Sequence, residues 1–136
     1  MLTEKDKIKH LYNRASFGVT FSDWQTKSDL EKCIDEVLKT PIKYTYLQTI
    51  SLAEVQAAQE KMKSVPKEEK KELKQLLKEN EKKKKNLWLN EMTKSEANLN
   101  EKMALFWHGH FACRSVNPYF DQQYLHSIRS NALGNF

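Results

Sequence analysis

Short capping sequences mark where helices should begin along most of this chain. In a capping box, a serine or threonine and a glutamate or glutamine three residues later satisfy two backbone amides at a helix start. The pattern occurs at Ser22 with Gln25, Ser28 with Glu31 and Ser51 with Glu54, and weaker forms begin at Thr3 and Asn98. The 136 residues include only 3 Gly and 3 Pro, so few positions interrupt a helix. The sequence therefore predicts an all-α fold of about six helices.

Apolar residues at helical spacing set the extent of each expected helix. We expect helices over residues 4–17, 29–39, 52–65, 67–93 and 99–114, and a last helix that starts at Pro118. A short helical turn from Ser22 should bury Trp24, and residues 41–50 should form an extended connector. These elements predict one helical domain over residues 1–136, or the N-terminal fragment of a larger domain.

The positive charge of the chain is concentrated in one segment. The net charge is +5, and residues 61–85 alone carry 11 Lys and 5 Glu. Because Pro66 interrupts this region, residues 51–95 should form a Lys/Glu-rich helical hairpin that projects from a compact core. The run Lys82–Lys85 is expected to be a solvated helix face. With only three arginines in the chain and no ladder of aromatic residues beside the lysines, the pattern disfavours nucleic acid as a partner.

Hydropathy and cysteine content leave the compartment open. No stretch approaches the ~18 consecutive apolar residues of a transmembrane helix, and the polar N-terminus contains no signal peptide. An exported protein whose leader had been removed would look the same. Cys33 and Cys113 are too few for a disulfide framework and are expected to be buried thiols, although one long-range disulfide stays open.

Histidines are the main candidates for chemistry. His108 and His110 are two residues apart, so on a helix they point ~200° apart and cannot hold one ion together. His110 shares an apolar face with Phe106, Trp107 and Cys113, whereas His108 falls off that face. We therefore expect a buried His110, which is a weak candidate for a metal ligand, and a surface His108. On this basis, binding of a divalent metal is kept as an alternative to a purely structural histidine.

Two further pairs place a histidine and an arginine on one helix flank. His10 and Arg14 are four residues apart, so they could share a carboxylate as a structural tie or form a clamp for an anionic substrate. His126 and Arg129 allow the same two readings, and there a structural role is favoured. The chain contains no phosphate loop, zinc-finger spacing, nucleophile elbow or dinucleotide fingerprint, so no cofactor is predicted.

Three stretches of the sequence resemble the signature stretches of one bacterial family. They are His10-Leu11-x-x-Arg14-Ala15-x-Phe17-Gly18, then Glu101-Lys102-Met103-x-x-Phe106-Trp107-His108-Gly109-His110-Phe111, then Arg129-x-x-Ala132-Leu133-Gly134-Asn135-Phe136. In these stretches and in their order, the chain resembles the family catalogued as domain of unknown function 1800. Members of that family are several hundred residues long and often carry export signals, so the resemblance implies an N-terminal piece of a longer protein. It implies no activity, because none is established for the family.

Two functional hypotheses follow from the sequence. The first is a helical module that forms the N-terminal part of a larger, exported bacterial protein and packs on the C-terminal remainder of that protein or on another protein. Apolar surface left exposed would then cause weak self-association. The alternative is the N-terminal part of a metal-dependent enzyme, whose site is completed by residues beyond 136. His108, His110, His10 and Arg14 are its candidate catalytic residues.

Overall fold

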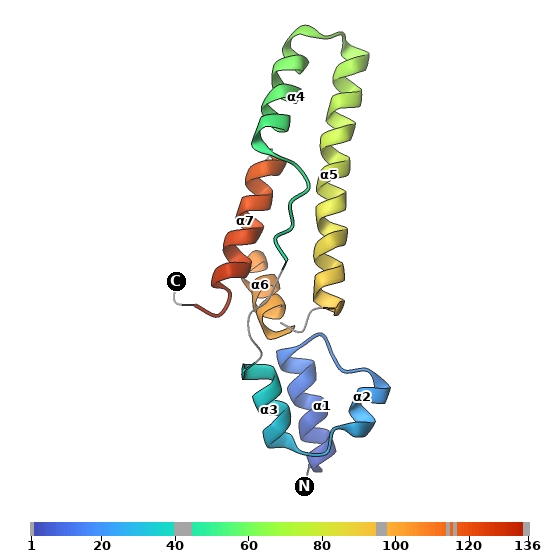
Figure 1. The fold of residues 1–136 in the computed structure, drawn as a ribbon, viewed down its shortest axis with the longest axis vertical. Helices are drawn as coiled ribbons and strands as arrows, with labels where there is room; N and C mark the ends of the chain where they lie inside the picture. The colour runs from blue at the N-terminus through green and yellow to red at the C-terminus, as the bar shows by residue number, and fades with distance from the viewer. Residues whose placement is uncertain (1, 40–44, 95–97, 114, 116, 135–136) are drawn as a thin grey trace.

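The chain is built from helices only, as the sequence predicts. The computed structural model describes residues 2–39, 45–94, 98–113, 115 and 117–134. Within them the chain forms seven helices and no strand (Figure 1). The helices are α1 (Glu4–Ala15), α2 (Phe21–Thr26), α3 (Leu30–Lys39), α4 (Leu52–Ser64), α5 (Lys67–Lys94), α6 (Asn98–His110) and α7 (Pro118–Asn131). Residues 41–44 of the expected connector, and Arg114, lie outside the described residues.

Side-chain caps define several helix starts, but two expected caps are wrong. The capping boxes of Thr3 with Asp6 and of Ser51 with Glu54 are both formed. The other two starts use different residues. α2 is capped by Thr20, whose hydroxyl accepts from the amide of Asp23, and the Asp29 carboxylate accepts from the Lys32 amide at the start of α3. Ser22 and Ser28 therefore do not begin these helices, because a neighbouring side chain already satisfies the free amides.

α6 lies at the centre of the arrangement. It contacts α1 and α3 on one side, and α5 and α7 on the other. α4 and the N-terminal half of α5 form a hairpin that extends beyond α7, while the C-terminal half of α5 packs on α6 and α7 (Figure 1). The hairpin thus projects as expected, although its second helix is also part of the core. No helix in the described part of the chain is both long and apolar enough to cross a membrane.

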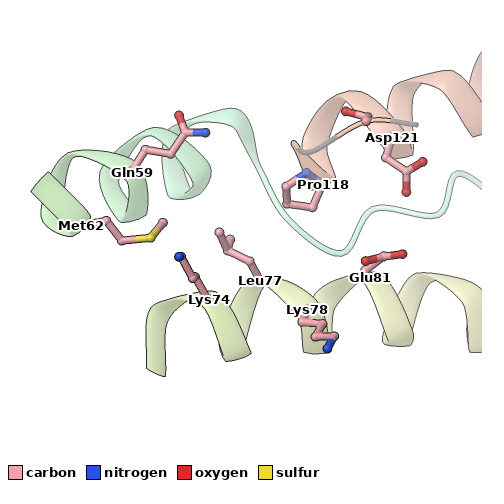
Figure 2. Close-up of a pocket in the computed structure, with 9 residues that line it drawn as sticks. Gln59, Met62, Lys74, Leu77, Lys78, Glu81, Pro118 and Asp121 are labelled. Carbon is pink, nitrogen blue, oxygen red and sulfur yellow. The ribbon is translucent and has the colours of Figure 1, made fainter. Parts of the chain in front are cut away.

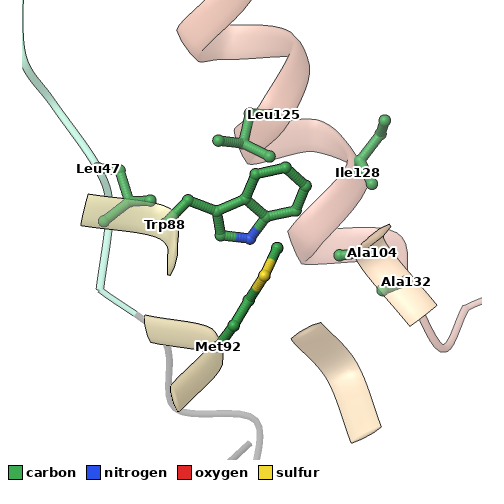
Figure 3. Close-up of a cluster of buried hydrophobic side chains, with 7 residues drawn as sticks. All are labelled: Leu47, Trp88, Met92, Ala104, Leu125, Ile128 and Ala132. Atoms are coloured by element: carbon green, nitrogen blue, oxygen red, sulfur yellow. The ribbon is translucent and has the colours of Figure 1, made fainter. Parts of the chain in front are cut away.

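Two separate apolar clusters form the interior. The larger one joins the C-terminal half of α5 to α6, α7 and the connector (Figure 3). Its buried residues are Leu47, Trp88, Met92, Ala104, Leu125, Ile128 and Ala132. The smaller cluster lies between α1 and α3 and contains Ile8, Tyr12 and Cys33. Ile8 and Tyr12 are four residues apart, so both lie on the face of α1 that packs on α3.

A buried ion pair runs through the larger cluster. Arg129 of α7 and Glu101 of α6 are 1% and 0% exposed, and the guanidinium Nη2 lies 2.6 Å from the Glu101 Oε1 atom. The Arg129 Nε donates to the same carboxylate at 3.0 Å, so the contact is bidentate. The Trp88 indole donates to Glu101 Oε2 at 2.8 Å, and Arg129 Nη1 donates to the carbonyl of Thr45 at 2.7 Å. One ion pair therefore joins α5, α6, α7 and the connector.

A single lysine fastens the N-terminal helices to α6. The Lys102 ammonium donates to the carbonyls of Asn13 and Ser16, at 3.1 and 2.7 Å, and lies over the ring of Phe17. These carbonyls belong to the last turn and the C-cap of α1, where backbone acceptors lack helical partners and a positive charge is favoured.

Breaking the Arg129–Glu101 pair should destabilise the protein strongly. Glu101→Gln leaves the buried guanidinium with only the longer ion pair to the Glu91 carboxylate, at 3.5 Å, so we expect the free energy of unfolding to fall by roughly 3 kcal/mol. The measurement is urea unfolding followed by circular dichroism. The matched control is Asp35→Asn, which removes an exposed ion pair with Lys39 and should cost less than about 0.5 kcal/mol. Equal losses in the two variants would contradict a central role for the buried pair.

Candidate functional site

The four residues singled out by the sequence lie in different surroundings. His10 and Arg14 are exposed on α1, in the part of the molecule that packs on α3. His110 is exposed at the end of α6, where its ring stacks on Phe106 with centroids 6.1 Å apart. His108 is partly buried and faces α5 and α7. Only His108 therefore lies in an enclosed, polar environment.

The expected burial of the two neighbouring histidines is wrong. His110 was predicted to be buried and is exposed, whereas His108 was predicted to be at the surface and is partly buried. The buried face of α6 starts with the polar residues Asn100 and Glu101, because these bind Arg129. Ala104 and His108 lie on the same face, because they follow Asn100 at intervals of four residues. Apolar periodicity predicted a different face, of which Met103 and Trp107 pack on the core while Phe106 and His110 are exposed.

Aromatic rings enclose His108 on two sides. The centroid of its ring lies 5.2 Å from that of Trp88 and 5.7 Å from that of Tyr124. The three residues come from α6, α5 and α7, so the position depends on the packing of all three helices. A pocket of about 230 Å³ opens beside the imidazole. Its lining is Glu81, Lys84, Lys85, Trp88, His108, Cys113, Ser115, Asp121 and Leu125.

An ion pair between Lys84 and Asp121 forms the charged wall of this pocket. Lys84 is only 4% exposed, and its ammonium donates to the Asp121 carboxylate of α7. The prediction that Lys82–Lys85 form a solvated face is therefore wrong at Lys84. Lys84, Trp88 and Met92 recur at four-residue steps, so they share the buried face of α5. That spacing was the one sequence signal that separated Lys84 from its neighbours.

The environment of His108 favours its neutral form. Burial lowers the pKa of His108 below its ordinary value of 6.5, and the positive charge of Lys84 lowers it further. The Asp121 carboxylate opposes this shift only in part. A neutral imidazole can accept a proton or a hydrogen bond from a group in the pocket. The arrangement therefore provides a base held between two aromatic rings and beside an ion pair.

A second hollow continues from this pocket along the hairpin. It measures about 350 Å³ and lies between α4, α5 and the start of α7 (Figure 2). Both hollows are lined by Glu81, Ser115 and Asp121. Figure 2 shows Asp121 on α7 facing α5 near Glu81, with Met62 and Leu77 at the apolar end. The two hollows therefore form one groove that leads from the hairpin to His108.

Tyr124 lies beside the free thiol of Cys113. The Tyr124 hydroxyl donates to the carbonyl of Phe111, and burial together with Cys113 raises the pKa of this tyrosine. Cys113 is exposed and Cys33 is buried, and both are free. The expected burial is confirmed for Cys33 and wrong for Cys113.

Another polar cluster near the first signature stretch does not contain His10 or Arg14. The Tyr12 hydroxyl donates to Glu36 at 2.7 Å, and the Lys27 ammonium lies over the Tyr12 ring and pairs with the same carboxylate. Burial raises the pKa of Tyr12 to about 12, and the hydrogen bond from Lys27 lowers that of Glu36. A hollow of about 460 Å³ lies beside them. No sequence pattern predicts this cluster, because Tyr12, Lys27 and Glu36 come from three separate segments of the chain.

The described residues do not assemble a metal site. No group of three or more His, Cys, Asp or Glu side chains in that part of the chain is arranged to hold an ion. Structural and catalytic zinc sites use at least three protein ligands. What the groove offers chemically is the single base His108, with Lys84 and Asp121 beside it.

A family model described as a protein of unknown function (DUF1800) matches residues 10–136. The chain belongs to this family. No curated protein and no solved structure matches it. The DUF1800 resemblance of the three sequence stretches is thus confirmed for nearly the whole chain.

In this DUF1800 chain, the three signature stretches are joined in space. Arg129 of the third stretch pairs with Glu101 of the second, and Lys102 of the second binds the carbonyl of Ser16 in the first. Their first role is therefore to assemble the fold. His108 is the one histidine of these stretches that also faces the groove.

The lowered pKa of His108 gives a testable pH dependence. In the unfolded chain this histidine titrates near 6.5, so below that pH the unfolded state binds more protons than the folded state. The stability contribution of neutral His108 is therefore present above pH ~6.5 and is lost as the pH falls through the folded pKa. In an NMR titration, we expect the midpoint of His108 to lie below 6.5.

Variants of the ion pair identify the cause of this shift. Lys84→Met should raise the His108 midpoint, and Asp121→Asn should lower it. The control is Lys85→Met, which removes a lysine with a smaller influence on His108 and should shift the midpoint less than Lys84→Met. A midpoint at or above 6.5 in the unaltered protein would refute the neutral-histidine account.

Proposed function

We propose that this chain, over residues 1–136, is a helical interaction module that binds further protein through aromatic residues at the end of α6. The observation that carries the proposal is the exposure of large rings on a rigid helix. Phe106 is 56% exposed and Phe111 is 41% exposed, although both lie in a signature stretch of the family. Large apolar side chains grouped at a surface are typical of binding sites.

The rings at this surface form an ordered stack. Phe106 stacks on His110 at an interplanar angle of 11°, and Trp107 stacks on Phe111 at 16°. Phe106 and Trp107 meet edge to face with centroids 4.9 Å apart. Such contacts hold the rings in place before a partner binds, which lowers the conformational entropy lost on binding. We name Phe106, Trp107, His110 and Phe111 the aromatic surface.

The aromatic surface borders the end of α7. The Trp107 indole donates to the carbonyl of Ala132 at 3.0 Å, and Leu133, the next residue, is 47% exposed. Leu105 on α6 is 43% exposed. The proposed partner is therefore an apolar protein segment, and the remainder of a longer family protein is the first candidate because the resemblance implies a chain that continues. The second candidate is another protein of the same compartment.

The experiment that tests the module is a measurement of self-association. Exposed apolar surfaces of separate molecules should meet at high concentration, so the mean mass in sedimentation equilibrium should rise with concentration. Phe106→Lys should weaken this association roughly tenfold or more without loss of helicity, because the side chain is largely exposed.

Phe21→Lys is the matched control for this experiment. Phe21 is 71% exposed on α2, outside the aromatic surface, and its replacement should leave the association unchanged. If Phe21→Lys disrupts the association as much as Phe106→Lys, general hydrophobicity explains the behaviour and the proposed surface is wrong.

The enzyme alternative depends on His108. A thermal unfolding scan with Zn²⁺ and with a chelator separates the two functions, because binding to the native state raises the unfolding midpoint. For the module we expect no rise with Zn²⁺. A rise that disappears in both His108→Ala and Cys113→Ser would instead favour a metal-dependent enzyme.

A further inference from the structure

Six of the ten lysines of α5 are arranged in one row along the helix. Their spacing is four, three, four, four and three residues, which keeps them on one side at ~100° per residue. All six are exposed. The row consists of Lys67, Lys71, Lys74, Lys78, Lys82 and Lys85. They occupy a sector of roughly 80° and extend over about 27 Å of helix length.

Three of the six glutamates of the same helix lie on a different side. Glu68, Glu72 and Glu79 form a second row, roughly 100° around the helix from the lysines. Among the described residues, only Lys85 of the lysine row forms an ion pair, with Glu81 at 2.6 Å. Glu81 therefore lies beside the lysine row and neutralises one end of it, while the other five lysines form no ion pair within the described residues.

From this arrangement we propose that the lysine row binds the surface of an anionic lipid bilayer. The row is about three times longer than the ~8 Å Debye length at physiological salt, so a small anion at one end is not attracted by the other end. Only an extended polyanion can interact with all six lysines at once. Extended polyanions of that size are nucleic-acid duplexes, acidic protein surfaces and anionic bilayers.

The charge pattern disfavours a nucleic-acid duplex. A helix in the major groove, which is ~12 Å wide, has phosphates on both flanks. On α5 one flank carries lysines, but the other carries the glutamate row, which the second wall of phosphates would repel. The row also contains no arginine for bidentate contacts to phosphate.

The composition of the row also disfavours an acidic protein. Stable protein interfaces have an apolar centre and are depleted in lysine. No apolar residue interrupts the lysine row, and Leu89, 57% exposed, lies only at its end, one turn after Lys85. A charged bilayer surface attracts lysines that stay hydrated, so it needs no apolar centre. Leu89 could then contact the headgroup region at the end of the row.

All six lysines of the row are exposed, although Lys74 and Lys78 also line the hollow between α4 and α5. α5 forms one long edge of the molecule, from the tip of the hairpin to the core (Figure 1). The binding is peripheral, because it uses hydrated charges on the outside of a folded helix. It is independent of the aromatic surface, which lies on α6.

The test is co-sedimentation of the whole chain with lipid vesicles at low salt. We expect binding to vesicles of equimolar phosphatidylcholine and phosphatidylglycerol, and none to phosphatidylcholine alone. Each basic residue near an anionic leaflet contributes about fivefold to the partition coefficient. The triple variant Lys71→Gln, Lys74→Gln, Lys78→Gln should therefore bind on the order of a hundredfold less tightly. Added salt should release the unaltered protein.

A matched triple variant excludes an effect of net charge alone. Lys7→Gln, Lys9→Gln, Lys32→Gln removes the same charge from exposed positions on α1 and α3, and should bind nearly as well as the unaltered protein. Circular dichroism verifies that both triple variants are folded. The proposal is overturned if the two triple variants lose binding equally, or if the chain binds neutral vesicles as well. It is also overturned if the chain does not bind the anionic vesicles, and binding to duplex DNA or polyglutamate in their place would identify the other class of polyanion.

Discussion

The buried pairing of Arg129 with Glu101 is the interaction on which the rest of the structure depends. Two charges without exposure to water are tolerated only when each is fully hydrogen-bonded, and here the carboxylate also accepts from Trp88 while the guanidinium also donates to Thr45. These four groups come from α5, α6, α7 and the connector. The helices can therefore pack only in the register that completes the network, which also positions His108 between Trp88 and Tyr124.

The extent of prediction from sequence follows the range of the interactions involved. Caps and helical stripes are local, so the helices, the hairpin and the inner face of α1 were predictable from the order of residues. The burial of Lys84, Glu101 and Arg129 depends on partners 28 or more residues away. A lysine within a run of four, or a glutamate at a helix start, reads as solvated when only its neighbours are considered. The buried side of α6 was predicted only in part for this reason, since polar contacts of Asn100 and Glu101 select it together with apolar packing.

The candidate site, the aromatic surface and the lysine row lie at different places on the same set of helices. The groove at His108 contains a neutral base but, within the described residues, no assembled metal site. The lysine row and the exposed members of the aromatic surface instead lie outside the apolar clusters, whereas Trp107 also packs on the larger one. Groups that are rigidly held and yet exposed are the ones free to interact with something else. This distinction separates the residues of the signature stretches that build the fold from Phe106 and Phe111.

The contact of Lys102 with the end of α1 has a consequence for cooperativity. α1 and α3 have their own small apolar cluster, separate from the one around Trp88, and the lysine ammonium is a principal polar link between the two halves. Separate clusters joined by a few hydrogen bonds behave as distinct foldons, which open at different free energies. Amide protons of α1 and α3 should thus exchange with solvent through local openings, while those of α6 and α7 should exchange only when the whole chain unfolds. The N-terminal helices α1 and α3 can therefore unfold locally while the core around Trp88 stays folded.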